Sequence, residues 1–159
     1  MTPDDPARSE PPRRATPADA ATVARMLHDF NTEFETPSPG IGKLTSRVAE
    51  LLAGEDVVVL LVGEPAGGLA VLSFRSNVWY PGPVAILDEL YVRPGLRGRR
   101  LGSALLAASC ELVRGRGGAL LEINVDGEDT DARRFYEARE FTNTGPDGTE
   151  PMLYYYREL

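Results

Sequence analysis

The stretch "LDELYVRPGLRGRRLGSALL", residues 87–106, joins an apolar run that ends at Val92 to a helical repeat that begins near Leu101. Four arginines and three glycines lie within residues 93–106, although the formal net charge of the chain is -7. Where a strand turns into a helix, the first N–H groups of the helix lack intrahelical partners, and the helix dipole adds partial positive charge. Arginine binds phosphate through two parallel hydrogen bonds. The stretch therefore predicts an anion site.

Several kinds of site fit a basic turn, and residue types separate them. A solvated basic loop is the ordinary role of a short basic cluster without context. A P-loop requires Gly-Lys-Ser/Thr at the helix start, whereas "RRLGS" (99–103) has no lysine. A dinucleotide fingerprint requires Gly-x-Gly-x-x-Gly, and "GLRGRRLG" (95–102) has another spacing. What remains is a pyrophosphate held by backbone amides and arginine, as in coenzyme A.

Hydrophobic periodicity predicts the elements around this turn. Thr16 and Pro17 fit the start of a helix whose apolar stripe runs from Val23 to Phe34. The helix after the turn makes the strands on either side of it a parallel pair. The other expected elements are strands at 13–16, 57–62, 69–74, 84–92, 119–125 and 152–159, and helices at 44–52 with a left-handed cap at Gly54, at 101–114 and around 132–136. The result is a mixed sheet with helices on its faces.

Length and composition fit one soluble domain of 159 residues, 42% hydrophobic and 26% charged. The negative net charge argues against nucleic acid or an anionic membrane as a partner. The single cysteine excludes an intramolecular disulfide, and no apolar stretch approaches the roughly 20 residues that span a bilayer. These features predict a cytoplasmic protein. Residues 1–12, rich in proline and charge, are expected to be a flexible tail before a domain over 13–159.

At residues 87–106 the chain resembles the acyl-CoA binding segment of the GNAT N-acetyltransferase superfamily, whose motif is Arg/Gln-x-x-Gly-x-Gly/Ala at the start of a helix. Arg97 and Gly102 match the ends of this motif. Arg100 stands where the middle glycine is usual, and its side chain could add a contact to phosphate.

A second stretch, "DTDARRFYEAREF" (129–141), is similar to the family's Asn-x-x-Ala-x-x-Phe-Tyr-x-x-x-Gly-Phe. Asp129 replaces Asn and Glu140 replaces Gly, while Ala132, Phe135, Tyr136 and Phe141 match. The two motifs follow the family's order, and the resemblance covers about residues 13–159. It implies a single α/β (α+β) domain with a mostly antiparallel twisted sheet, one central parallel strand pair and helices on both faces.

The resemblance implies acetyl-CoA as cofactor, no metal, and direct transfer of the acetyl group to a primary amine in a ternary complex. By the same resemblance, a backbone N–H near Val92 stabilises the oxyanion. The residues expected to bind the cofactor are Leu90, Tyr91, Val92, Arg97, Gly98, Arg99, Arg100, Leu101, Gly102, Ser103, Asn124, Arg133 and Tyr136.

Transfer to an amine requires a base, because a protonated amine is not a nucleophile. Glu89 is the preferred candidate and Asp88 the second, since some family members carry an acidic residue at one or both positions. Neighbouring residues of an ideal strand point to opposite faces, so only one of the two would lie in the site. Tyr136 matches the family's tyrosine near the cofactor sulfur and is expected to act as general acid. Alternatively, either carboxylate pairs with a neighbour such as Arg93, and Tyr136 is a packing residue.

The acceptor is expected between the first helix, the loop after it and the ends of the strands. "HDFNTEFE" (28–35) and "NVWYPG" (77–82) mix aromatic and acidic side chains. Acidic residues near the site suit a cationic amine of a small molecule or peptide. The residues expected to bind it are Phe30, Glu33, Trp79, Tyr80 and Glu89.

Two other classes of function stay open at the level of sequence. One is a catalytically silent acyl-CoA-binding or interaction module on the same scaffold, suggested by Arg100, Asp129 and Glu140. The other is a nonspecific phosphate-binding protein. The tyrosine-rich "YYYREL" (154–159) fits either a core strand or an interface of a homodimer.

Overall fold

The computed structural model describes residues 10–159 of the chain, so most of the tail expected over 1–12 lies outside the described residues. Contacts divide the chain into two units, one ending at Glu122 and the other comprising Ile123–Leu159. The first holds β1 (Arg13–Arg14), η1 (Pro17–Asp19), α1 (Ala20–Glu33), α2 (Ile41–Ala53), β2 (Val57–Val62), β3 (Gly68–Arg75), β4 (Val84–Val92), η2 (Pro94–Leu96) and α3 (Leu101–Gly115). β5 (Leu120–Ile123) leads into the second unit, which holds α4 (Thr130–Glu137).

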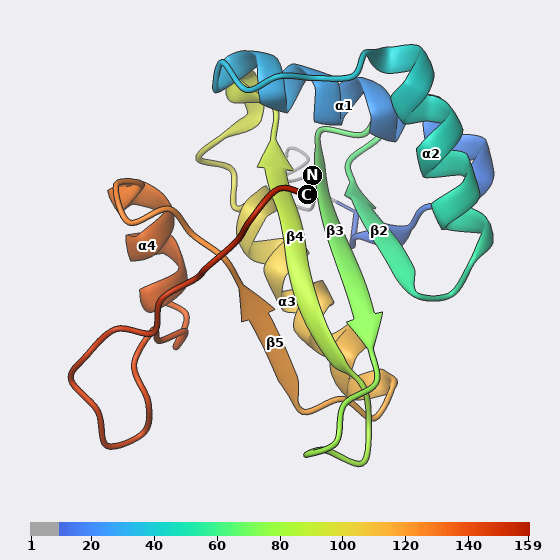
Figure 1. Cartoon of the computed structure of the whole chain (residues 1–159). Helices are drawn as coiled ribbons and strands as arrows, with labels where there is room; N and C mark the ends of the chain where they lie inside the picture. Colours follow the sequence, from blue (N-terminus) through green and yellow to red (C-terminus); the bar gives the residue numbers. More distant parts are fainter. Residues whose placement is uncertain (1–9) are drawn as a thin grey trace, which may run out of the picture. The chain divides into compact units, whose positions relative to one another are not determined.

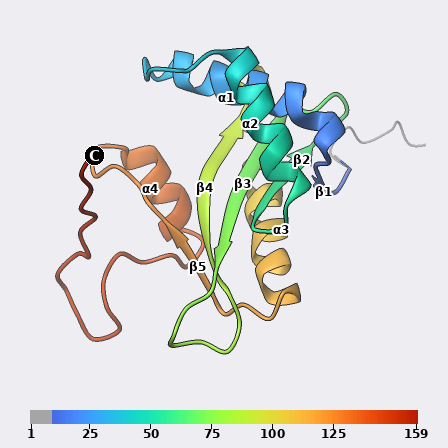
Figure 2. The same cartoon turned by 45° about the vertical axis from the view of Figure 1, so that its right-hand side comes forward.

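The sheet follows the order β1-β2-β3-β4-β5 (Figure 1). Strands β1 to β4 pair antiparallel, with Val57 opposite Ser73 and Gly68 opposite Val92. β2, β3 and β4 lie side by side in both views (Figures 1 and 2). Helix α3 connects β4 to β5, which makes these two the parallel pair. The predicted mixed, mostly antiparallel sheet is confirmed. The parallel pair, expected at its centre, lies instead at its end, because no further strand pairs with β5 in the described residues.

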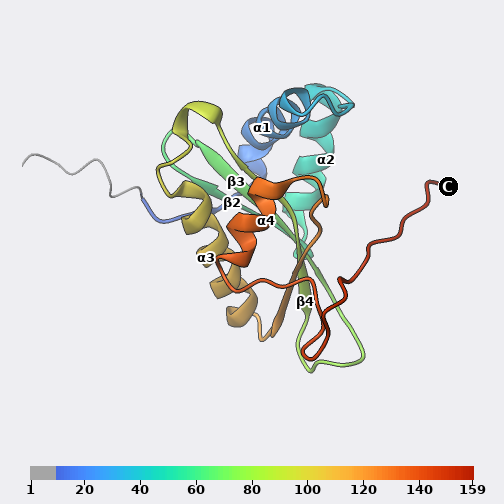
Figure 3. The same cartoon turned by 90° about the vertical axis from the view of Figure 1, so that its left-hand side faces the viewer.

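Helices cover both faces of the sheet, as predicted (Figure 3). Residues of β2 alternate between the faces: Val59 and Leu61 join a buried cluster with Val23 and Met26 of α1. On the other face, Leu105 of α3 is fully buried. It lies so close to β3 that a Cβ added to Gly68 would be 3.1 Å from the Leu105 side chain. This packing fixes the start of α3 against the end of β4.

Asp19 holds the junction between β1 and the first helix. Its two carboxylate oxygens accept hydrogen bonds from the Arg13 guanidinium at 2.8 and 2.9 Å, and one of them also accepts the backbone N–H of Thr16 at 2.8 Å. These donors, Arg13 first, lower the pKa of Asp19 to about 2. Because the pKa is lowered, the stability that Asp19 contributes is present above the ordinary carboxyl pKa and is lost as the pH falls toward 2.

The prediction of a left-handed cap at Gly54 is wrong. Gly54 has φ -93° and ψ -174°, which is extended backbone. Its N–H donates to the carbonyl of Leu51 at 3.1 Å, so a tight final turn closes α2. A helix end satisfied in this way needs no left-handed residue, and the chain continues directly toward β2.

The prediction of a strand over residues 152–159 is also wrong. These residues have no regular secondary structure, and the large apolar side chains among them are exposed. The nearby pairing is an isolated antiparallel bridge between Thr144 and Pro151. The N–H of Met152 donates to the carbonyl of Asn143 at 2.6 Å, and no regular pairing of the residues after Met152 follows in the described part of the chain. The strand expected over 119–125 is also shorter, at Leu120–Ile123.

The loop after α4 contains a side chain in a conformation that glycine prefers. Glu140 has φ 67°, in the left-handed region. The family motif has glycine here, and the left-handed backbone survives the replacement. An L-residue with a Cβ pays about 1 kcal/mol relative to glycine in this region.

Glu140→Gly is therefore expected to stabilise the protein by about 1 kcal/mol, which corresponds to a melting temperature roughly 2–4 °C higher. Thermal unfolding followed by circular dichroism measures it. Glu140→Ala removes the same charge but keeps a Cβ, so it should bring no such gain. A lower melting temperature for the glycine variant would contradict a left-handed Glu140.

Candidate functional site

The basic turn has the strand-turn-helix geometry that the sequence predicts. β4 ends at Val92, a short η2 follows, and α3 begins at Leu101. Gly98 has φ 78° and Arg100, the N-cap residue, has φ 63°. The carbonyl of Arg100 accepts the N–H of Ala104 at 3.0 Å, which is the first bond of the helix. The first turn of α3 contains no acidic residue, so nothing in it opposes an anion.

Arg100 keeps the left-handed conformation that the glycine of the family motif would adopt easily. The departure from the motif therefore leaves the backbone path of the turn intact. Its conformational cost, about 1 kcal/mol, comes with an exposed positive charge next to the helix start. Compared with glycine, Arg100 lowers the stability of the fold and adds a positive charge beside the helix start.

Arg97 is engaged with the protein itself. Its Nη1 and Nη2 lie 2.6 and 2.7 Å from the two carboxylate oxygens of Glu33, the last residue of α1. Its Nε donates to the carbonyl of Val92 at 3.0 Å. The hydrogen bond that Arg97 donates to Glu33 is the main cause of a raised pKa for Arg97. A predicted cofactor residue and a predicted acceptor residue are thus joined by a two-pronged ion pair.

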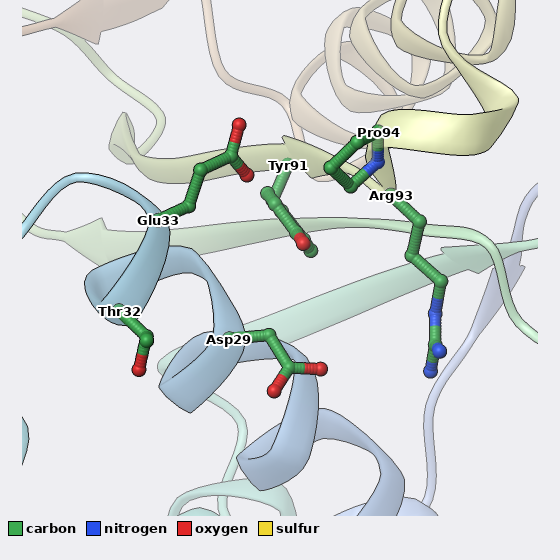
Figure 4. Close-up of a pocket in the computed structure, with 6 residues that line it drawn as sticks. All are labelled: Asp29, Thr32, Glu33, Tyr91, Arg93 and Pro94. Atoms are coloured by element: carbon green, nitrogen blue, oxygen red, sulfur yellow. The ribbon is translucent and has the colours of Figure 1, made fainter.

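An open pocket of about 430 Å³ lies beside this ion pair (Figure 4). Asp29 and Glu33 reach it from one face of α1, since they are one helical turn apart. Tyr91 of β4 forms its floor and stacks on Phe30, with ring centroids 5.1 Å apart. Desolvation by burial is the main cause of a raised pKa for Tyr91, followed by the nearby Glu33. Thr32, Arg93 and Pro94 complete the lining.

A bulge in β4 contains the two candidate bases and brings them to one face of the sheet, because Asp88 bonds to Ser73, which lies on the same face of β3 as Val71, the partner of Glu89. The alternation of an ideal strand, which would place them on opposite faces, does not hold here. Val71 pairs with Glu89 and Leu72 with Leu87, so Asp88 is the extra residue of the bulge. Asp88 is exposed and accepts a hydrogen bond from the hydroxyl of Ser73.

Glu89 lies on the same face of β4 as Tyr91, since it is two residues away along the strand. That face is the one covered by α1, because Tyr91 belongs to the core cluster of α1 and α2. Glu89 is half-buried, and burial first and Asp88 second raise the pKa of its carboxyl. Burial thus raises the proton affinity of Glu89.

Trp79 and Tyr80 lie apart from the other predicted acceptor residues. They belong to the loop before β4, whereas the basic turn follows its end (Figure 1). Nine strand residues at about 3.3 Å each separate the two ends by roughly 30 Å. Asn77 holds this loop by accepting the backbone N–H groups of both residues, at 2.9 and 2.7 Å. The structure brings together Phe30 and Glu33 but not Trp79 and Tyr80.

The second unit carries Asn124, Arg133 and Tyr136. Asp129 caps α4 by accepting the N–H of Ala132 at 2.9 Å, so aspartate replaces the motif's asparagine without loss of the cap. Arg133 donates to the carbonyl of Gly127 at 3.1 Å. The ring of Tyr136 packs edge-on against Phe135 and Phe141, with centroids 5.2 and 5.7 Å away.

Several residues that line the pocket were not among the predicted site residues: Asp29, Thr32, Arg93 and Pro94. The four-residue spacing of Asp29 and Glu33 is a signal that places both on one helix face. Arg93 has a buried Nε without a hydrogen-bond partner within the described part of the chain. Across residues 10–159, no cluster of three or more His, Cys, Asp or Glu side chains is suited to a metal ion.

The model of the acetyltransferase (GNAT) family matches residues 24–141. The chain belongs to this family. The sheet order and the strand-turn-helix at the basic turn agree with that membership. The crystal structure of a protein from Arthrobacter sp. FB24, described as an acetyltransferase, is 83% identical and superposes with a TM-score of 0.92. That match covers 98% of this chain and 100% of the other.

Two curated GNAT relatives are more distant. The aminoglycoside N(6')-acetyltransferase type 1 of Stenotrophomonas maltophilia is 29% identical, over 92% of either chain. The mycothiol acetyltransferase of Beutenbergia cavernae is 39% identical over 42% of this chain. The match spans only 24% of that longer relative.

Replacing Glu89 by glutamine tests the burial of its carboxyl. Because the pKa of Glu89 is raised, the folded state holds the proton more tightly than the unfolded chain does, so stability falls as the pH rises from the ordinary carboxyl pKa through the raised one. Glu89→Gln is expected to melt about 2 °C above the wild type at neutral pH. This gain should disappear below about pH 4, where the carboxyl is neutral in both states.

Asp88→Asn is the companion variant: it removes the charge that is the second cause of the raised pKa but leaves Glu89 buried, so any gain from relieving Glu89 should be smaller than that of Glu89→Gln. Melting curves from pH 3 to pH 8 distinguish the two variants. A Glu89→Gln difference that stays constant over this range would exclude ionisation of a buried carboxyl as its cause.

Proposed function

We propose that the protein is an acetyl-CoA-dependent N-acetyltransferase that transfers the acetyl group directly to a primary amine in a ternary complex. The observation that carries the proposal is the basic turn: a left-handed entry into α3, surrounded by arginines, in a chain with net charge -7. A dianionic pyrophosphate is the ligand that such a turn suits. Membership of the GNAT family supports the acetyl group.

In this proposal the cofactor lies along the end of β4 and over the start of α3. The backbone of Leu90, Tyr91 and Val92 would face its pantetheine arm. Residues 97–103 would hold the diphosphate through the first-turn amides of α3 and the guanidinium groups of the turn. By resemblance to the family, Asn124, Arg133 and Tyr136 are also proposed to contact the cofactor.

The amine must lose a proton before it attacks the thioester. Glu89 suits this step, because burial raises the pKa of its carboxyl toward that of a base working near neutral pH. The nitrogen then forms a bond to the carbonyl carbon, and the C–S bond breaks as the tetrahedral intermediate collapses. Tyr136 donates a proton to the leaving thiolate. Asp88 is less suited, since its carboxylate already accepts the Ser73 hydroxyl.

The acceptor is a cationic amine of a small molecule or peptide. Asp29 and Glu33 bring two carboxylates to one wall of the pocket, and Tyr91, which stacks on Phe30, gives it an aromatic floor. Similarity to an aminoglycoside N(6')-acetyltransferase supports an amine of a small molecule as the acceptor. Within residues 10–159, no helix is both long enough and apolar enough to span a bilayer. Cytoplasmic location, homodimer formation and the absence of nucleic-acid partners stay predictions.

An assay with acetyl-CoA and a panel of polyamines, aminoglycosides, amino acids and N-terminal peptides tests the proposal. We expect at least one amine to release free thiol above the rate with acetyl-CoA alone. A thiol-reactive dye measures the release, and mass spectrometry identifies the acetylated amine. Binding of acetyl-CoA without turnover of any acceptor would contradict the proposal for these amine classes.

Tyr136→Phe is the matched variant in the same assay. It keeps the aromatic ring packed between Phe135 and Phe141 and removes only the hydroxyl. Loss of a general acid is expected to lower kcat by about 10²-fold or more while the affinity for coenzyme A changes little. An equal loss of kcat and of cofactor affinity would argue against the acid role.

Arg100→Gly separates backbone strain from charge in the basic turn. The variant is expected to melt roughly 2–4 °C higher because glycine adopts φ 63° freely. It should bind coenzyme A about two- to fivefold more weakly, since one exposed cation is lost. Calorimetry and thermal unfolding measure the two effects. Arg100→Ala should lose the same affinity without gaining stability, and unchanged affinity in both variants would remove Arg100 from the cofactor site.

A further inference from the structure

We propose that Glu33 and the diphosphate of coenzyme A compete for Arg97, so that cofactor binding releases Glu33 to hold the ammonium group of the acceptor. This inference rests on the proposed function. It gives one ion pair a role in coupling the binding of the two substrates.

The competition follows from the contacts of the Arg97 guanidinium. Two of its N–H groups meet the carboxylate of Glu33 at 2.6 and 2.7 Å, and a third meets the carbonyl of Val92. A carboxylate this close offsets the positive charge that a diphosphate would use. A diphosphate at the turn would also repel the carboxylate beside it. Full use of Arg97 by the cofactor therefore requires that Glu33 move away.

Because Glu33 lies at the C-terminal end of a helix, its carboxylate needs a nearby cation when it no longer contacts Arg97. Glu33 is the last residue of α1, where the helix dipole carries partial negative charge and disfavours a carboxylate. Arg97 offsets this repulsion in the structure, and 27% of the Glu33 side chain is exposed, on the pocket side. Once Arg97 turns to phosphate, Glu33 needs another cation. The ammonium group of an acceptor in the pocket supplies it.

Asp29 is the natural comparison for Glu33, because it is a second carboxylate of the pocket that is not paired with Arg97. It lines the same pocket from the preceding turn of α1. In the part of the chain that the structure describes, however, no arginine or lysine lies within ion-pair distance of Asp29. Arg93 also lines the pocket but is not ion-paired with Asp29. Before the cofactor binds, Asp29 is thus the one pocket carboxylate without an ion-pair partner in the described residues, and afterwards Glu33 joins it. By linkage, cofactor and cationic amine then strengthen each other's binding.

Calorimetric titration of the full-length protein with coenzyme A tests the competition in wild type, Glu33→Gln and Asp29→Asn. Glu33→Gln is expected to bind coenzyme A about two- to fivefold more tightly than the wild type, the range for an exposed ion pair. Asp29→Asn removes the same charge one turn away without breaking the pair, so its gain should be smaller. Melting curves confirm that each variant is folded.

Two further titrations assign the gain to Arg97 and to phosphate. In an Arg97→Gln background, Glu33→Gln should gain no more affinity than Asp29→Asn does. Pantetheine, which lacks the diphosphate, should bind wild type and Glu33→Gln equally. Equal coenzyme A affinities of wild type and Glu33→Gln, or the same gain with pantetheine, would overturn the competition while leaving the proposed function intact. No binding of coenzyme A to the folded wild type would overturn both.

Discussion

The chain must turn from the end of β4 into α3 within eight residues, and the whole site depends on how the backbone makes this turn. Gly98 and Arg100 adopt left-handed conformations there, and Leu105 anchors the helix against Gly68 of β3. The result directs the positive end of α3 toward the place where β4 stops. The arginines of the turn lie on one side of that point, and the carboxylates of α1 that face them lie on the other.

The local distribution of charged residues, and not the net charge of the chain, determines the electrostatics of the site. The chain is acidic overall, yet the turn and the first turn of α3 carry no acid. The carboxylates that balance the turn come from α1, across the end of β4. Glu33 touches Arg97 directly, whereas Glu89 is set back along β4, where burial keeps its proton affinity high. Neighbouring acids thus differ in what they can do because their surroundings differ.

Much of the fold could be predicted because its elements have strong local signals. The β-branched run at 57–62 and the apolar repeat from Leu101 each identify an element by periodicity alone. The strand at 152–159 failed for the opposite reason: tyrosines favour strands, but strand formation needs a partner, and the ladder stops at Pro151. Local preference cannot supply a neighbour.

The site was predictable where it is continuous in sequence and not where it is assembled. The basic turn lies within one stretch, whereas Glu33 and Arg97 are 64 residues apart and meet only in the fold. The bulge at Asp88 brings Asp88 and Glu89 to one face of β4, and no residue type in the sequence indicates a bulge there. Trp79 is close to β4 in sequence, but at the wrong end of the strand. Closeness to a strand in sequence does not show whether a residue lies near the end of the strand that forms the site.

The location of the tryptophan has a practical consequence for spectroscopy. Trp79 is the single tryptophan of the chain, its side chain is 87% exposed, and the length of β4 separates it from the basic turn. Its emission therefore reports the solvent around a hairpin tip. Intrinsic fluorescence is a poor probe of ligands at the other end, and an optical label for that purpose has to be introduced near α1.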